Sequence, residues 1–149
     1  MPQEIAEDIF FLAGRRGGRY PYCNSLYIRD ERSALIDPAC DPKELKALGK
    51  IDLIILSHFH SDHIRELRLF PNAEIAIHEQ EAKAMEDVQA LINLIFFPDE
   101  DPREKENWIQ RKKREMHSFS WGFKINHHLK DKEIIKLGRY EIEVIHTPG

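Results

Sequence analysis

Residues 53–63 read Leu-Ile-Ile-Leu-Ser-His-Phe-His-Ser-Asp-His, an apolar run followed at once by three imidazoles and one carboxylate. The uninterrupted apolar run, residues 53–56, predicts a strand that is covered on both faces of a sheet. The polar residues after it would then lie at the carboxyl end of a central strand, where open α/β sheets bind ligands. This stretch therefore predicts both the fold class, α/β, and the place of the functional site.

Neutral imidazole and carboxylate are ligands that zinc, iron and manganese accept in proteins. Residues two apart face the same way in an extended segment, so we expect His58 and His60 to bind one ion together. Asp62 and His63 come where the chain turns toward a helix predicted over residues 64–70, and we expect them to face a second ion. A single histidine is more often a surface or core residue without a ligand role, but the grouping of all four residues favours a metal centre.

Hydrolysis is the chemistry expected of such a centre. A bound metal ion lowers the pKa of a coordinated water to about 7, so metal-bound hydroxide would be available as a nucleophile near neutral pH. If only one ion is present, the Asp62 carboxylate could instead accept a proton from the attacking water.

The segment Ser57-His58-Phe59-His60-Ser61-Asp62-His63 resembles the His-x-His-x-Asp-His signature of the metallo-β-lactamase superfamily. The resemblance extends to a strand that ends in an aspartate (residues 34–37), to the next strand (71–78) and to a hairpin that ends in Thr-Pro-Gly (130–149). It implies an αββα sandwich, an α/β (α+β) fold of which this chain covers mainly the N-terminal half. It also implies zinc as the cofactor, as one or two ions, with iron or manganese as alternatives.

The same resemblance assigns roles to individual residues. It implies that His58, His60, Asp62 and His63 are the metal ligands and that Asp62 is the catalytic residue. Asp37, at the end of the aspartate strand, would orient a ligand or the loop. His146 occupies a position where the family has a histidine that usually does not bind metal.

In the family, a histidine after the Thr-Pro-Gly turn, a bridging aspartate and a last histidine complete the site, whereas this sequence stops at Gly149. We therefore expect residues 1–149 to form a single domain that is incomplete at its C-terminus. The leading hypothesis is a metal-dependent hydrolase of a small ester, thioester, amide or phosphoester. One alternative is a catalytically incomplete metal-binding half-domain that needs a missing segment or a partner, and its uncovered apolar faces predict a homo-oligomer. The other is a metal-dependent nuclease, which only the basic run at residues 111–114 favours.

The composition narrows the partners. A net charge of −4 argues against a dedicated binder of polyanions, so we expect a small-molecule substrate rather than nucleic acid. The two cysteines, Cys23 and Cys40, have no spacing that suggests a zinc knuckle or a disulfide framework, and the cytoplasm is the simplest compartment. No apolar stretch approaches the roughly 20 residues that a membrane helix needs, so we expect no membrane partner.

Before the histidine segment, alternating apolar patterns predict a β-meander with strands at residues 9–12, 25–28 and 33–36. The Gly/Arg-rich loop at residues 14–19 could be a flap over the site or an ordinary hairpin loop. A short helix is predicted to begin after the capping residue Asp41 and to end at Gly49.

After the histidine segment, helical periodicity predicts one helix over residues 79–97. Residues 98–126 are predicted to leave the core as a helix at 101–116 followed by an extended segment. That extended segment has Phe119, Trp121, Phe123 and Ile125 on one face, as core packing or as a pocket wall. His127 and His128 would point in opposite directions, so we treat them as surface residues.

Overall fold

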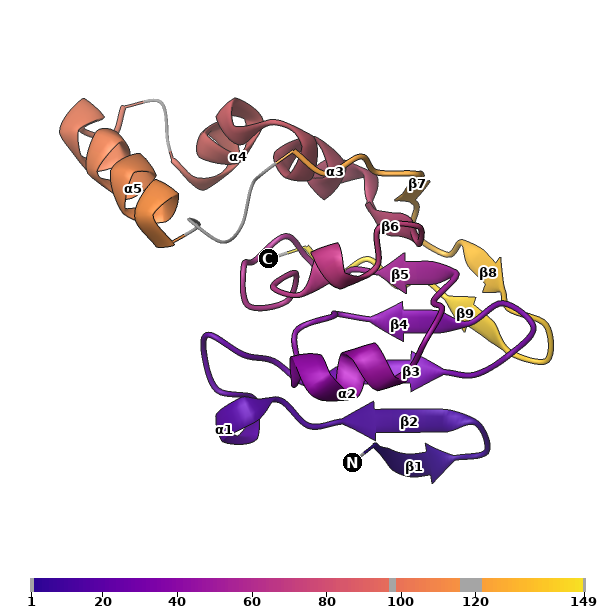
Figure 1. The fold of residues 1–149 in the computed structure, drawn as a ribbon. Helices are drawn as coiled ribbons and strands as arrows, with labels where there is room; N and C mark the ends of the chain where they lie inside the picture. The colour runs from indigo at the N-terminus through magenta and orange to yellow at the C-terminus, as the bar shows by residue number, and fades with distance from the viewer. Residues whose placement is uncertain (1, 97–98, 116–121, 149) are drawn as a thin grey trace.

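The computed structural model describes residues 2–96, 99–115 and 122–148 (Figure 1). Within these residues, seven strands form one mixed sheet and two more form a separate hairpin. The strands are β1 (Gln3–Ala6), β2 (Ile9–Leu12), β3 (Ser25–Ile28), β4 (Ala34–Ile36), β5 (Leu53–Ile55), β6 (Glu74–His78), β7 (His127–Leu129), β8 (Ile134–Lys136) and β9 (Glu141–Glu143). The helices are α1 (Arg15–Gly18), α2 (Pro42–Ala47), α3 (Glu79–Glu86), α4 (Val88–Ile95) and α5 (Pro102–Glu115), with a 3₁₀ turn, η1 (Leu67–Leu69).

The large sheet has the strand order β1-β2-β3-β4-β5-β6-β7. Strands β1 to β4 pair antiparallel, which confirms the predicted meander and adds β1 to it. Strands β4, β5, β6 and β7 pair parallel, so their carboxyl ends lie at one edge of the sheet. The histidine segment leaves β5 at this edge, as its sequence predicts.

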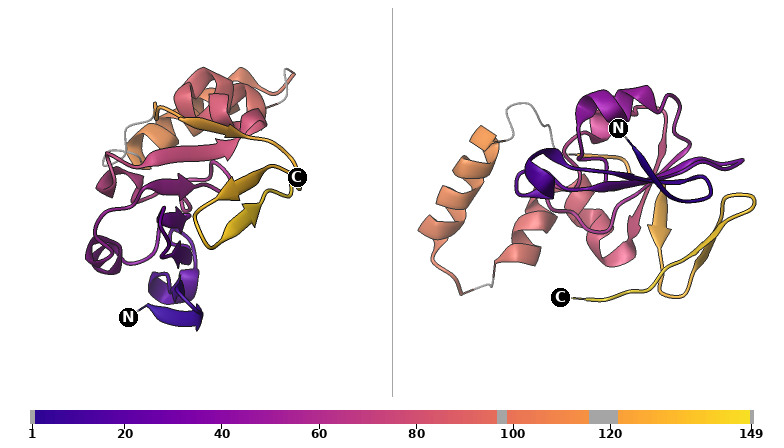
Figure 2. Two further views of the ribbon diagram at one scale, coloured as in Figure 1. Left: turned by 90° about the vertical axis from the view of Figure 1, so that its right-hand side faces the viewer. Right: turned by 90° about the horizontal axis from the view of Figure 1, so that it is seen from below.

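Both faces of β5 are covered, because all three of its residues are buried. Ile54 packs in a cluster with apolar residues of α2 and α3, whereas Leu53 and Ile55 pack in a second cluster with the β8–β9 hairpin. Figure 2 shows α2 and this hairpin on opposite faces of the sheet. The mixed α/β architecture predicted from the apolar run is therefore confirmed.

Helix α2 carries the chain from β4 to β5 and begins where its capping residue predicts. Asp41 Oδ1 accepts a hydrogen bond from Lys43 N at 2.8 Å, and Pro42 occupies the first position of the helix. Leu45 is fully buried and anchors the helix to the sheet. The helix stops before Gly49, whose φ of +77° lies in the left-handed region.

Two predicted helices differ from the structure. The helix predicted over residues 79–97 is broken at Asp87, which has extended backbone angles (φ −133°, ψ 122°). Its carboxylate caps α4 by accepting a hydrogen bond from Gln89 N at 2.9 Å. The helix predicted over residues 64–70 is reduced to the 3₁₀ turn η1.

The predicted excursion includes α5, which lies away from the sheet (Figure 1). Its Trp108 ring meets the Phe96 ring edge-on, with 5.5 Å between centroids. Phe119 and Trp121 of the predicted aromatic face, and the side chains at 112–114 in the basic run, lie outside the described residues. Phe123 and Ile125 are buried in the core that includes Ile54, which favours packing for these two.

The β8–β9 hairpin is fastened to the turn between β1 and β2 by ion pairs. Arg139 places Nη1 2.8 Å from Glu7 Oε1 and Nη2 2.6 Å from Asp8 Oδ2, and Arg29 Nη2 lies 2.6 Å from Asp8 Oδ1. Hydrogen bonds from Arg29 and Arg139 hold the pKa of Asp8 below its usual value. Tyr140 adds a hydrogen bond from its hydroxyl to the Glu7 carbonyl.

None of the helices in the described part of the chain combines the length and apolar character needed to cross a bilayer.

Candidate metal centre

The histidine segment is a loop that the protein holds at several points. Phe59 N donates to Glu81 Oε2 of α3 at 2.9 Å, and His63 N donates to the His60 carbonyl at 3.0 Å, which closes a turn. Ile64, directly after the segment, is fully buried. The loop is thus fixed to the helix layer while its polar side chains stay at the edge of the sheet.

Within this loop, the structure brings together the four residues predicted as ligands. His58 Nε2 lies 3.0 Å from His60 Nδ1, and the His58 and His63 rings have centroids 4.1 Å apart. Asp62 Oδ2 lies 3.8 Å from His63 Nε2. Three ring nitrogens and a carboxylate therefore gather at the carboxyl end of β5, although their role as metal ligands stays a prediction.

Asp37, which follows β4, contacts Ser57 and His63 of the histidine segment. Ser57 donates to its carboxylate twice, from N to Oδ1 at 2.8 Å and from Oγ to Oδ2 at 2.6 Å. His63 Nδ1 lies 2.8 Å from the same Oδ2. The carboxylate is largely buried, and its backbone φ of +51° lies in the left-handed region, which Asp tolerates better than most residues. Asp37 thus contacts His63 and the residue before His58, and its orienting role stays a prediction.

These contacts set the protonation of both rings. An ionised carboxylate only accepts hydrogen bonds, so Asp37 requires a proton on His63 Nδ1. Ser57 Oγ gives its own proton to Asp37, so it accepts at 2.9 Å from His58 Nδ1–H. Both rings therefore carry the proton on Nδ1 and keep the Nε2 lone pair for another partner.

The pKa shifts of the two rings run in opposite directions. Burial, together with the neighbouring His63 and His60, lowers the pKa of His58 and keeps its ring neutral. The hydrogen bond to Asp37 raises the pKa of His63 and outweighs the opposing effect of burial. The His63 ring therefore stays doubly protonated up to a higher pH than the His58 ring, and its Nε2 lone pair is available to a cation only in the neutral form.

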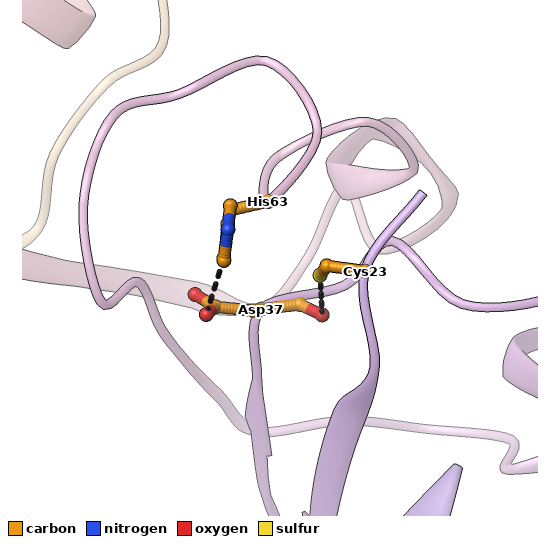
Figure 3. A group of neighbouring side chains, drawn as sticks. All are labelled: Cys23, Asp37 and His63. Atoms are coloured by element: carbon orange, nitrogen blue, oxygen red, sulfur yellow. Dashed lines mark hydrogen bonds and ion pairs between the residues drawn. The ribbon is translucent and has the colours of Figure 1, made fainter. Parts of the chain in front are cut away.

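Cys23 also lies against this group. The ligand atoms of Cys23, Asp37 and His63 all fall within 4.8 Å of one another. Figure 3 shows His63 directed at the Asp37 carboxylate and the Cys23 sulfur directed at the Asp37 carbonyl. The thiol contacts the carbonyl of Asn24 at 3.1 Å and that of Asp37 at 3.9 Å. Burial raises the pKa of the Cys23 thiol to about 12, and the nearby carboxylates of Asp37 and Asp62 add to the shift.

Sequence reasoning missed Cys23, and a signal for it existed. Strands β3 and β4 pair antiparallel with Leu26 opposite Ile36, so residues just before β3 must lie beside residues just after β4. Extending that register from a predicted hairpin would have placed Cys23 near Asp37. Cys40 is also buried, but its sulfur contacts the Asp41 carbonyl at 4.0 Å.

The remaining histidines lie in other contacts. The His78 and His146 rings stack with centroids 3.6 Å apart and an interplanar angle of 7°. Nitrogen lone pairs of parallel rings point along parallel planes, so this stack does not aim two donors at one ion. His127 Nε2 lies 2.5 Å from Glu133 Oε1, and His128 is exposed on β7. The sequence predicts His127 and His128 only as surface residues, and it does not predict β7 itself.

The family model of the metallo-beta-lactamase superfamily matches residues 19–102. The chain belongs to this superfamily. The matched range contains Asp37 and the whole of residues 57–63. No curated protein matches the sequence significantly.

Solved structures share the metallo-beta-lactamase fold with this chain at low sequence identity. A beta-lactamase from Chitinophaga pinensis has a TM-score of 0.67 at 18% identity over 99% of this chain and 52% of its own. A class B3 di-zinc metallo-beta-lactamase from an Alaskan soil metagenome has a TM-score of 0.65 at 17% identity over 99% and 52%. A flavodiiron protein from Giardia intestinalis has a TM-score of 0.54 at 14% identity over 96% and 33%.

The chain spans about half the length of the first beta-lactamases that it matches. It corresponds to the N-terminal portion of the superfamily fold, as the resemblance implies.

The residues of this superfamily member fit the metal that the fold implies. Two nitrogens bound to one tetrahedral zinc at about 2.0–2.1 Å lie about 3.3 Å apart. The 3.0 Å between His58 Nε2 and His60 Nδ1 needs an opening of only about 0.3 Å to meet that geometry. Burial lowers the pKa of His58 and so favours its neutral imidazole, which is the form that binds metals. The donor set and its spacing therefore suit a zinc ion.

Proposed function

We propose that this metallo-beta-lactamase superfamily member is a metal-dependent hydrolase whose cation is held by His58, His60, Asp62 and His63. The observation that carries the proposal is the convergence of His58 Nε2 and His60 Nδ1 at 3.0 Å, beside His63, at the carboxyl end of β5. Zinc is the cation proposed, as one or two ions. When bound, zinc supplies a Lewis acid that makes water nucleophilic near neutral pH.

The chain's own residues have separate tasks in this reaction. His58 and His60 hold one cation through the two nitrogens that face each other. Asp62 offers a carboxylate next to His63 Nε2, either as a ligand or as the group that accepts the proton of the attacking water. Asp37 and Ser57 hold the His58 and His63 rings in the tautomer that leaves Nε2 free.

The substrate class proposed is a small ester, thioester, amide or phosphoester. Each of these compounds has a carbonyl or phosphoryl group with an electrophilic carbon or phosphorus. A metal ion held by imidazole and carboxylate ligands can polarise that group and so assist the attack of water.

The test is the metal content and hydrolytic activity of the purified protein. A double substitution, His58→Ala with His60→Ala, should abolish zinc binding and reduce hydrolysis of a panel of chromogenic esters, thioesters and phosphodiesters to the buffer rate. His128→Ala is the matched control, since this histidine is exposed on β7 and should change neither quantity. Zinc bound with unchanged stoichiometry in the double variant, or hydrolysis that persists there, contradicts the proposal.

A further inference from the structure

We propose that Cys23, Asp37 and His63 form a second metal position, for a thiophilic divalent cation such as Cd²⁺, on the side of the His63 ring that faces Asp37. The proposed hydrolase uses the other side of this ring. The metal position itself does not rest on the proposed function, whereas the competition between the two positions does.

The three side chains come from three separate segments that the sheet brings together. Cys23 precedes β3, Asp37 follows β4 and His63 follows β5, so the antiparallel and parallel pairings place all three at the same edge. One ligand atom from each lies within 4.8 Å of the other two (Figure 3). Ligands at about 2.3 Å for sulfur and about 2.0–2.2 Å for nitrogen or oxygen lie about 3.3–3.6 Å apart around one tetrahedral ion, so a cation would have to close the widest of these separations by as much as about 1 Å.

The donor set selects the class of cation. Sulfur, imidazole nitrogen and carboxylate oxygen together suit zinc and softer ions, and a thiolate disfavours magnesium and calcium. Cys23 and Asp37 are each only 7% exposed, so a divalent charge there needs compensation from its ligands. Thiolate and carboxylate together supply two negative charges, which neutralise the ion.

Two protons must move when the cation binds, one from Cys23 and one on His63. The Cys23 S–H bond breaks as the sulfur–metal bond forms, and the thiol proton leaves to solvent. The His63 proton moves from Nδ1 to Nε2, because a neutral imidazole offers one lone pair at a time. The bond between His63 Nδ1 and Asp37 Oδ2, now 2.8 Å, is replaced by two bonds to the shared cation, while the two Ser57 bonds to Asp37 remain.

Mutual exclusion follows from that proton shift. With its proton on Nε2, His63 no longer has a lone pair for the position beside Asp62. A soft ion held by Cys23 would therefore remove one ligand from the proposed hydrolytic site without entering it.

The experiment is a Cd²⁺ titration of the purified metal-free protein, followed by ultraviolet absorption. Binding at Cys23 gives a sulfur-to-cadmium charge-transfer band, which stops growing once each protein molecule holds one Cd²⁺ ion at Cys23. We expect this band in the unsubstituted protein and in Cys40→Ser, and its complete loss in Cys23→Ser. Cys40 is the matched control because it is the other buried cysteine, with its sulfur at the Asp41 carbonyl.

A band that is missing from the unsubstituted protein, or that survives in Cys23→Ser, overturns the proposal. If Cys23→Ser fails to fold, cadmium NMR of the unsubstituted protein decides the question, because sulfur ligation shifts the resonance far downfield of sites with only nitrogen and oxygen. Zinc binding lost in the His58/His60 double variant, with no sulfur band in any variant, supports the proposed function and refutes the second metal position. A sulfur band in a protein whose zinc content does not depend on His58 and His60 supports the second metal position and refutes the proposed function.

Discussion

Replacing Asp37 by Asn separates the orienting role of this carboxylate from its contribution to stability. Asn is nearly isosteric and tolerates the φ of +51° at this position, so the backbone can stay where it is. Its amide oxygen can still accept the bond from Ser57 N, but the nitrogen that replaces Oδ2 donates instead of accepting. The bonds from Ser57 Oγ and from His63 Nδ1 are therefore lost or reversed.

The magnitudes follow from those two bonds. A hydrogen bond to a charged group contributes about 1.5–3 kcal/mol to stability and a neutral one about 0.5–1.5 kcal/mol, so the exchange of two bonds should lower the free energy of unfolding by about 2 kcal/mol. His63 and His58 would both turn to the tautomer with the proton on Nε2. Loss of a partner that orients a metal-binding histidine typically lowers metal affinity about 10–100-fold, and we expect the same for zinc.

Urea unfolding of the metal-free protein measures the free energy of unfolding, and calorimetric zinc titration measures the zinc affinity. Asp52→Asn is a matched control at the opposite end of β5, where Asp52 Oδ2 accepts from Ser33 N at 3.0 Å and from Ser33 Oγ at 2.9 Å. It should lower stability and leave zinc affinity unchanged. The reasoning is refuted if Asp37→Asn loses stability as expected while zinc binds as tightly as before, or if both variants weaken zinc equally.

Other predictions concern the rest of the fold. Hydrogen bonds led by Lys50 lower the pKa of Asp52 to about 2, so the stability it contributes, about 1 kcal/mol after solvent screening, is present above pH 4 and lost as the pH falls through 2. The difference in urea midpoint between the unsubstituted protein and Asp52→Asn should accordingly vanish near pH 2, and a constant difference would contradict the assignment. Ile54→Ala opens a cavity at a fully buried position of β5 and should cost about 3–4 kcal/mol by urea unfolding, whereas a loss below about 1 kcal/mol would show that β5 is not central. A double-mutant cycle on His78 and His146 should give a coupling of about 1 kcal/mol for the stacked rings, and no coupling would mean that the stack does not persist in solution.

Local patterns were enough to predict the elements that position the site. The apolar run at residues 53–56 is buried on both faces because it is the centre of a sheet with packing on each side, which is what such a run indicates. Asp41 and Pro42 predicted the start of α2 because helix capping depends on neighbours in sequence. The gathering of the four residues in 58–63 was predictable for the same reason, since they are close in the chain.

The break at Asp87 was missed although its signal is local: the helical periodicity continues across Asp87, but this side chain caps α4 through Gln89 N, two residues further on. Features that depend on distant partners were not predictable. Strand β7 holds two histidines and forms because β6 offers it an edge, in spite of a weak strand pattern. Cys23 reaches the site only through the pairing of β3 with β4. The extent of the excursion at residues 98–126, the assembly into homo-oligomers and the ligand roles of the histidines stay predictions.

The ion pair between Arg139 and Asp8 joins residues 131 positions apart in the chain. Bringing such distant segments together carries a loop-closure entropy that grows with separation, and long-range pairings slow folding. On the ribosome, where elongation proceeds at about 5–20 residues per second, the β1–β2 turn emerges many seconds before Arg139 has been synthesised. During that interval the β1–β2 turn lacks its ion pair with Arg139 and is accessible to chaperones and to neighbouring nascent chains.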